Sequence, residues 1–166
     1  MKRLSWLTVL LVLALLVTVA ASAMPRLFVA SLSGDQEATP VETDAFGRAI
    51  FHFNPTETRM KFTLRVANIE DVVAAHIHCA PPGQNGPVGV TLFMGGPVSF
   101  KHGVLAKEFV SAPNDGNACG WASLADVAAA MRAGNAYVNV HTLANPGGEI
   151  RGNIGAVNDP YPSPVR

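Results

Sequence analysis

Short segments of alternating apolar and polar residues, separated by Gly, Pro and Asn, constrain the fold of this chain more than any other feature. In MKFTLRV, residues 60–66, apolar side chains occupy every second position. This period of two predicts a β-strand with one buried face. The preceding segment GRAIFHF, residues 47–53, is followed by NPTET, and Asn-Pro is a turn signal. We therefore expect the two segments to form an antiparallel hairpin.

Other parts of the chain have the composition of further strands and of one helix. The helix is predicted over SLADVAAAMRAGN, with Ser123 as N-cap, Asp126 three residues later and Gly134 as the C-terminal stop. About eight short strands and one short helix predict an all-β fold, an immunoglobulin-like β-sandwich or flattened Greek-key barrel. The further strands are expected at Leu27 to Ser33, Val72 to His78, Val88 to Phe93, Val104 to Phe109, Tyr137 to Leu143 and Glu149 to Ile154. The predicted core includes Phe62, Leu64, Ile77, Val138, Val140 and Ile150.

The N-terminal segment has the pattern of an export signal. A basic start precedes the apolar run LTVLLVLALLVTVA, and Ala-Ser-Ala follows at residues 21–23, where a signal peptidase requires small side chains. A retained membrane anchor is the alternative, because the run approaches the roughly 20 residues that span a bilayer. We predict a signal peptide over residues 1–23, one domain over 24–156 and a Pro-rich extended tail over 157–166. The protein is then exported, either periplasmic or secreted.

Charge and motifs exclude several classes of function. Without residues 1–23, which contain Lys2 and Arg3, 10 basic side chains face 12 acidic ones. This balance gives no electrostatic footprint for nucleic acid, and no basic amphipathic helix favours a membrane after signal cleavage. The sequence also has no nucleophile elbow and no phosphate-binding glycine loop before a helix. An enzymatic function therefore has no motif to support it.

The two cysteines, Cys79 and Cys119, both belong to the exported part. In an oxidising compartment an isolated pair is most simply a disulfide, which here would close a loop of about 40 residues. The competing interpretation makes Cys79 a thiolate ligand of a metal beside His76 and His78. We favour the disulfide, because a free thiol outside the cytosol is prone to oxidation.

Three histidines form a candidate metal site. His76 and His78 are one residue apart in AAHIHC, so in a strand they project to the same face. In YVNVHT, Val138 and Val140 take the core face, and His141 takes the outer one. If the two strands are neighbours, about 4.8 Å apart, the three imidazoles converge on the outer face within reach of one ion. We expect Cu or Zn as the ion, with binding that weakens as the pH falls through about 6.

Several motifs in this order resemble the CHRD domain, the module first described in chordin and found in many exported bacterial proteins. They are AHIH and the following Pro/Gly loop PPGQNGP, and later YVNVHT and NPGGEIRG. The resemblance covers about residues 27–154 and implies an immunoglobulin-like β-barrel. It implies little about biochemical activity, and it does not imply the disulfide, since the family commonly has a small residue at the position of Cys79.

Three functions stay open. The favoured one is an exported, non-catalytic metal-binding module that uses His76, His78 and His141. The alternative is an extracellular structural, adhesion or protein-interaction domain, in which the histidines only form hydrogen bonds and the partner is an extracellular or periplasmic protein. A copper enzyme similar to superoxide dismutases is a minor alternative, because the sequence lacks a zinc loop with a bridging histidine. His52 faces away from Phe51 and Phe53 and is interpreted as a solvated edge residue, with an extra metal ligand as the alternative, and His102 is placed in a turn.

Overall fold

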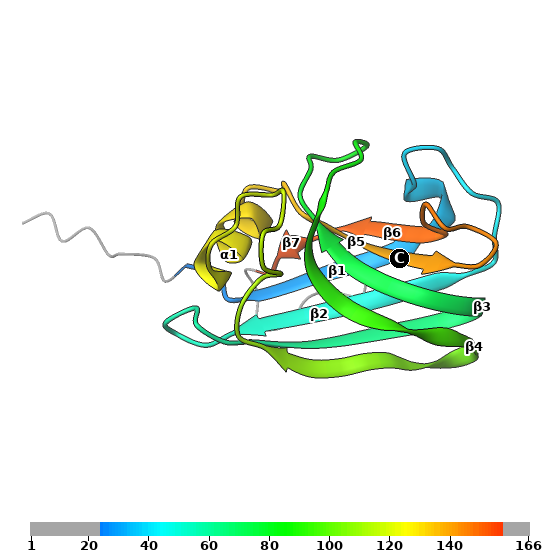
Figure 1. Ribbon diagram of the computed structural model, residues 1–166, viewed down its shortest axis with the longest axis horizontal. Coiled ribbons are helices and arrows are strands. Elements are labelled where there is room, and N and C mark those ends of the chain that lie inside the picture. Colours follow the sequence, from blue (N-terminus) through cyan, green and yellow to red (C-terminus); the bar gives the residue numbers. More distant parts are fainter. Residues whose placement is uncertain (1–23, 158–166) are drawn as a thin grey trace, which may run out of the picture.

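The computed structural model describes residues 24–157, and these residues form one all-β domain (Figure 1). The predicted signal peptide lies outside the described residues, as does the predicted tail after Val157. Within residues 24–157, no helix is both long and apolar enough to cross a membrane. The elements in chain order are β1 (Leu27–Ser33), the 3-10 turn η1 (Gly34–Gln36), β2 (Phe46–Phe53), β3 (Met60–His78), β4 (Val88–Val110), α1 (Leu124–Arg132), β5 (Tyr137–Thr142), β6 (Ile150–Asn153) and β7 (Gly155–Ala156).

The strands form a sheet that closes on itself. Its order is β2-β1-β6-β5-β3-β4, and an additional pairing between β2 and β3 completes a ring. The predicted hairpin is confirmed, with Phe51 opposite Phe62 and Ala49 opposite Leu64. β4 pairs with β3 over nearly its whole length and lies outside the ring. The all-β fold class predicted from the sequence is thus confirmed.

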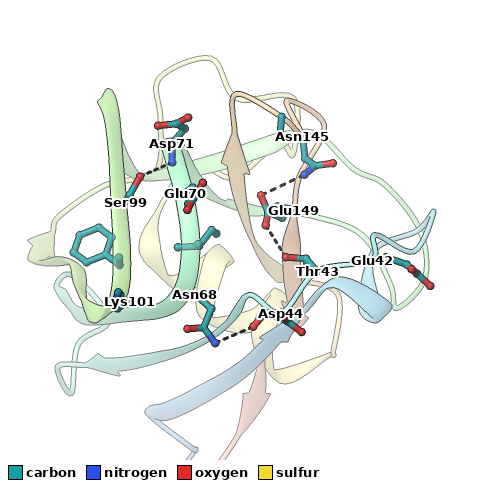
Figure 2. A pocket seen from close by; sticks show the side chains of 13 residues that line it. Glu42, Thr43, Asp44, Asn68, Glu70, Asp71, Ser99, Lys101, Asn145 and Glu149 are labelled. Carbon is teal, nitrogen blue, oxygen red and sulfur yellow. Dashed lines mark hydrogen bonds between the residues drawn. The ribbon is translucent and has the colours of Figure 1, made fainter.

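Two expected pairs of short strands are each one long strand in the structure. The first half of β3 pairs with β2 and the second half pairs with β5, so this strand belongs to both walls of the barrel. It bends between them, where Asn68 and Asp71 adopt positive φ angles of 51° and 50°. Asn and Asp tolerate this conformation, which is why the strand changes direction here without a Gly or Pro. The backbone at the bend is held by hydrogen bonds such as that from the Asp71 N–H to Ser99 Oγ, 2.9 Å (Figure 2).

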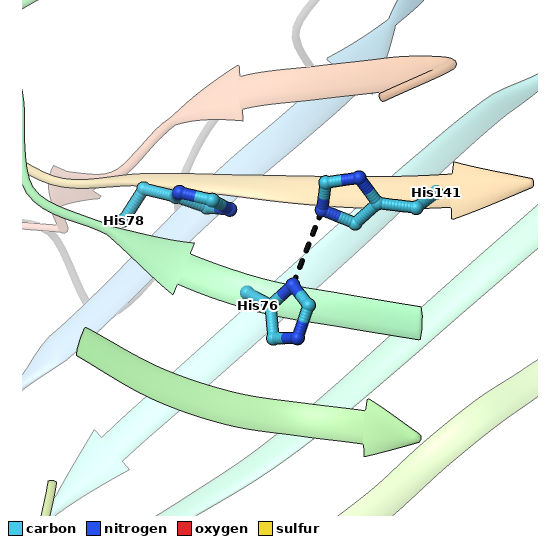
Figure 3. Close-up of side chains that lie close together, drawn as sticks. All are labelled: His76, His78 and His141. Atoms are coloured by element: carbon cyan, nitrogen blue, oxygen red, sulfur yellow. Dashed lines mark hydrogen bonds between the residues drawn. The ribbon is translucent and has the colours of Figure 1, made fainter. Parts of the chain in front are cut away.

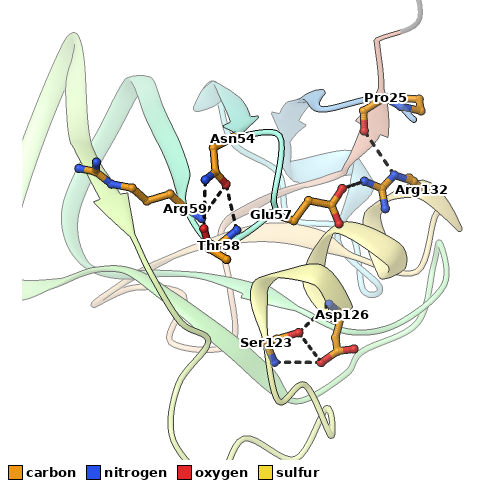
Figure 4. A network of polar contacts seen from close by, with 8 residues as sticks. All are labelled: Pro25, Asn54, Glu57, Thr58, Arg59, Ser123, Asp126 and Arg132. Atoms are coloured by element: carbon orange, nitrogen blue, oxygen red, sulfur yellow. Dashed lines mark hydrogen bonds and ion pairs between the residues drawn. The ribbon is translucent and has the colours of Figure 1, made fainter. Parts of the chain in front are cut away.

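The core lies inside the ring and is capped by the helix. All six residues predicted for the core are buried, with at most 1% of their surface exposed. The helix begins and ends as predicted. Ser123 and Asp126 form a capping box at its start (Figure 4), and Gly134 after its end has a φ of 71°. The apolar side of the helix, Leu124, Val127, Ala128 and Met131, is buried against the strands. An ion pair between Arg132 and Glu57 ties the last turn of the helix to the β2–β3 turn (Figure 4).

Candidate metal centre

The second half of β3 and the adjacent strand β5 carry the three histidines predicted as ligands. Ala74 pairs with His141 and His76 pairs with Asn139, so the imidazoles project from neighbouring strands on the same side of the wall. Ile77 and Val140 project to the opposite side, into the core. One ring nitrogen from each of His76, His78 and His141 lies within 4.8 Å of the others (Figure 3). Within residues 24–157 this is the one group of three or more potential ligands that converges in this way.

The histidines are more buried than the sequence predicts. We expected them on a half-exposed outer face, but His76 and His78 are only 9% and 8% exposed. The face lies away from the core, as expected, but loops cover it. The loop after β3 contacts His78 through the Gly86 carbonyl, and the loop after β5 contacts His141 through the Pro146 carbonyl. Alternation assigns a face to a side chain, whereas it does not indicate whether a loop folds over that face.

Hydrogen bonds determine which nitrogen of each ring is free to bind a metal. The Nδ1 atoms of His78 and His141 lie 2.9 Å from the carbonyl oxygens of Gly86 and Pro146, respectively. A carbonyl only accepts hydrogen bonds, so both Nδ1 atoms carry protons and both Nε2 atoms are unprotonated. His76 Nδ1 lies 3.1 Å from His141 Nε2 and donates to it. His78 Nε2 is buried and has no hydrogen-bond partner among the described residues.

The electrostatic environment keeps the three imidazoles neutral. Burial, together with the neighbouring His141 and His78, lowers the pKa of His76 from 6.5 to about 4. Burial also lowers the pKa values of His78 and His141, against the opposing effect of their carbonyl partners. Neutral imidazole is the form that binds metals, so the unpaired lone pairs are available at neutral pH.

Tyr137 and Arg151 hold the covering loop in place over His78. The ring of Tyr137 stacks on the His78 imidazole, with centroids 4.9 Å apart and planes 9° apart, and its hydroxyl accepts a hydrogen bond from Gly86 N–H. The Arg151 guanidinium lies 3.7 Å from the centroid of the Tyr137 ring and donates to the Asn85 side chain and to the Gln84 carbonyl. The buried side chains of Tyr137 and Arg151 thus hold the loop that orients His78.

A buried carboxyl group, that of Glu37, lies on the same face as the three histidines. It accepts hydrogen bonds from the Asn139 amide at 2.9 and 3.1 Å, just after the turn η1. Burial raises the pKa of Glu37 from 4.5 to about 7, although Arg151 and the Asn139 amide oppose this effect. The Asn139 Oδ1 atom is buried and without a partner among the described residues. Glu37 therefore titrates near neutral pH beside the histidine-bearing strands.

The two cysteines are bonded to each other, as predicted. The Sγ atoms of Cys79 and Cys119 form a disulfide that spans 40 residues of sequence. Because the disulfide occupies Cys79 Sγ, the alternative in which this residue is a thiolate ligand is wrong. The disulfide joins the residue directly after His78 to the loop before the helix.

Glu149 and the two other histidines do not contribute to this centre. The Glu149 carboxylate lies in an acidic pocket at the β3 bend, where it accepts a hydrogen bond from the Thr43 hydroxyl (Figure 2). It also accepts one from the Thr142 hydroxyl. Arg151 does not pair with Glu149, its neighbour in the sequence, but contacts the loop after β3. His52 is exposed on β2, as interpreted from the sequence. His102 is also exposed, but it lies within the continuous strand β4, where we expected a turn.

Sequence reasoning identified the three imidazoles but not the groups that orient them. Gly86 and Pro146 contribute backbone carbonyls, which have no residue-type signature. A positional signal was present, because PPGQNGP and ANPGGE each follow a histidine-bearing strand directly. Gly86 also has a packing reason, since a Cβ atom there would overlap the carbonyl oxygen of Cys79. Nothing in the local sequence around Glu37 indicates its contact with Asn139, which is 102 residues away.

Comparison with known proteins gives a family and no individual relative. Searches of curated proteins and of solved structures find no match. The family model described as the CHRD domain matches residues 28–154. This range includes both histidine-bearing strands, both cysteines and the loops that cover the site. With most of its length matched by this family model, the chain belongs to the CHRD domain family.

Proposed function

We propose that this protein is an exported, non-catalytic module that binds a copper or zinc ion through His76, His78 and His141. The observation that supports this most strongly is the unpartnered Nε2 atom of His78. Its Nδ1 proton is already donated to the Gly86 carbonyl, so Nε2 has a lone pair that is buried without a donor. A purely structural role for the histidine leaves this polar atom unsatisfied, which costs about 1–3 kcal/mol. A metal ion satisfies it.

The donor set fits a metal of this class. Tetrahedral coordination with Zn–N bonds of about 2.0–2.1 Å requires nitrogens about 3.3 Å apart. The His76 and His141 nitrogens that face each other are 3.1 Å apart, which is within a few tenths of an ångström of this separation. The three nitrogens lie within 4.8 Å of one another, so binding would draw His78 closer to the other two rings. Coordination through His76 Nδ1 would require the proton of this ring to move from Nδ1 to Nε2, which gives Nδ1 the lone pair that a metal needs. Imidazoles suit both Zn²⁺ and Cu²⁺, and affinity at a given site favours Cu²⁺.

The hydrogen bonds around the site have the pattern of a second coordination shell. Metal-binding histidines almost always donate their other ring N–H to a carbonyl or carboxylate, which fixes the tautomer and orients the ring. His78 and His141 both do this through Gly86 and Pro146. The lowered pKa values also change an expectation from the sequence. Protons should compete with the metal at a pH below 6, because these imidazoles are harder to protonate than exposed ones.

Export is the second part of the proposal. The disulfide between Cys79 and Cys119 fits an oxidising compartment, because disulfides persist outside the reducing cytosol. The N-terminal pattern supports a signal peptide that ends at Ala23, so the mature protein should begin at or near Met24. N-terminal sequencing of the exported protein tests this. A sequence starting at Met1 or Lys2 on exported protein would refute it.

Calorimetric titration of the metal-free protein with Zn²⁺ and Cu²⁺ tests the metal site. We expect one ion per chain, and the affinity should fall by tenfold or more in His78→Ala. His102→Ala is the matched control, because this exposed histidine lies outside the site and its replacement should leave the affinity unchanged. Equal affinity in the wild type and in a variant with all three ligands changed to Ala would favour the structural or adhesion domain, in which the histidines only form hydrogen bonds.

A further inference from the structure

The outer surface of the wall formed by β1, β2, β3 and β4 is strongly cationic. Antiparallel register places Arg48 directly opposite Arg65, and His52 opposite Lys61, on neighbouring strands. Thr63 pairs with Lys107 one step further along the wall. We call this surface the cationic face and define it by four exposed cations, Arg48, Lys61, Arg65 and Lys107, and by the exposed histidines beside them, His52 and His102.

No carboxylate balances these charges on the same surface. The positions that share the face are occupied by Leu27, Val29, Ser31, Ser33, Phe46, Ile50, Thr63, Val104 and Phe109. The one ion pair within residues 24–157 joins Arg132 to Glu57, away from this wall. Like charges directly opposite each other in a sheet are destabilising. An anion bound between Arg48 and Arg65 would offset that repulsion.

Two hollows in this surface are lined by cationic groups and by no acidic residue. The first, of about 810 Å³, includes Arg48, Arg65 and His102 in its lining. The second, of about 400 Å³, lies toward the other end of the strands and includes His52 and Lys61. It is also lined by Arg26 and by Arg59, whose guanidinium lies 4.3 Å from the centre of the Phe109 ring.

The distance between the two hollows indicates the shape of the ligand. Arg48 and His52 are four residues apart on β2, as are Arg65 and Lys61 on β3, so the two cationic rows are about 13 Å apart. Lys107 lies between the rows, opposite Thr63. A single small anion reaches one hollow only. A linear polymer with regularly spaced negative charges reaches both hollows and passes the lysine between them.

We propose that the cationic face binds an acidic polysaccharide, through its carboxylate or sulfate groups. The disulfide fits an oxidising compartment outside the cytosol, where an exported protein can meet acidic polysaccharides. At the second hollow the Arg59 and Lys61 side chains lie over the Phe109 ring, so this aromatic ring is covered by cations. Exposed Phe46, beside the first hollow, provides a ring on which a sugar can stack. This proposal does not depend on the metal site.

Binding of the purified protein to immobilised polygalacturonate and to heparin tests the proposal, because the first polymer carries carboxylates and the second carries mostly sulfates. We expect binding to at least one of them at low ionic strength, weakening as salt is added. Arg48→Gln together with Arg65→Gln should weaken binding by about tenfold or more. Lys101→Gln is the matched control, since Lys101 is exposed beside Glu70 and Asp71 in the acidic pocket at the β3 bend (Figure 2).

Three results would overturn the proposal. The first is the absence of binding to both polymers at low ionic strength. The second is a loss of binding free energy per charge removed that is equal in Lys101→Gln, which removes one charge, and in the Arg48/Arg65 variant, which removes two; this would mean that net charge alone is sensed. The third is binding to vesicles of phosphatidylglycerol and phosphatidylcholine without binding to either polymer, which would make the face a membrane-contacting surface. Circular dichroism and thermal unfolding of each variant exclude misfolding as the cause of lost binding.

Discussion

The buried side chains of His76 and Glu37 should make the free energy of unfolding of the metal-free protein depend on pH in opposite directions. The two effects nearly cancel, and Glu37→Gln should separate them. The pKa of His76 is lowered from 6.5 to about 4 in the folded protein, so the unfolded chain binds protons more tightly. The contribution of His76 to the free energy of unfolding is present above pH 6.5 and is lost as the pH falls below 6.5. His78 and His141, whose pKa values are also lowered, act in the same direction.

Glu37 acts in the opposite direction. Its pKa is raised from 4.5 to about 7, so the folded protein binds the proton more tightly than the unfolded chain. The contribution of Glu37 is therefore fully present below pH 4.5 and is lost as the pH rises through about 7. Between pH 7.5 and pH 5.0, these pKa values imply a loss of about 2 kcal/mol from His76 and a gain of about 2 kcal/mol from Glu37.

The free energy of unfolding in urea, measured at pH 7.5 and pH 5.0 with a chelator present, tests this balance. We expect a modest decrease for the wild type, because His78 and His141 add to the loss. In Glu37→Gln the compensating titration is absent, whereas Gln still accepts a hydrogen bond from Asn139 through its side-chain oxygen. The variant should lose at least about 2 kcal/mol more than the wild type over this pH interval. An identical pH dependence in the two proteins would refute the burial argument for Glu37.

Three further substitutions test the scaffold through the free energy of unfolding. Replacing both Cys79 and Cys119 by Ser should cost about 4 kcal/mol, the loop-closure value for a 40-residue separation, and a loss below 1 kcal/mol would contradict this estimate. Ser123→Ala removes the helix cap and should cost about 1 kcal/mol; unchanged stability would mean that the capping box contributes nothing. Gly148→Ala should cost more than about 2 kcal/mol, because Gly148 has a φ of 127° and a Cβ atom there would overlap the Asn139 side chain. A neutral effect would show that this loop readily moves away from β5.

The parts of the structure that depend on local patterns were predictable from the sequence. The hairpin of β2 and β3 follows from the alternation in residues 47–53 and 60–66, and the helix follows from Ser123, Asp126 and Gly134. The projection of the three histidine side chains from one face of the sheet follows from the same period of two. The strand count was overestimated because β3 continues through a bend at non-glycine residues, such as Asn68, and β4 continues through Gly95, Gly96 and Pro97, where a break between two strands had been expected.

The parts of the site that depend on tertiary contacts were not predictable. Burial of His76 and His78 results from loops that fold over an outer face, and a strand's alternation contains no information about them. Arg151 has a neighbouring carboxylate in sequence, Glu149, yet it binds a loop more than 60 residues away, because register and loop packing decide its partner. Such contacts between distant segments leave no periodic signal.

X-ray absorption at the zinc edge of protein loaded with one equivalent of Zn²⁺ tests the central claim most directly. The account predicts a first shell with three histidine nitrogens at about 2.0–2.1 Å, completed by one light-atom ligand such as water. The imidazole rings should give multiple-scattering features, and these should decrease by one ring in His78→Ala. A shell of oxygen ligands without imidazole scattering, or a spectrum unchanged in His78→Ala, would contradict a metal site built from His76, His78 and His141.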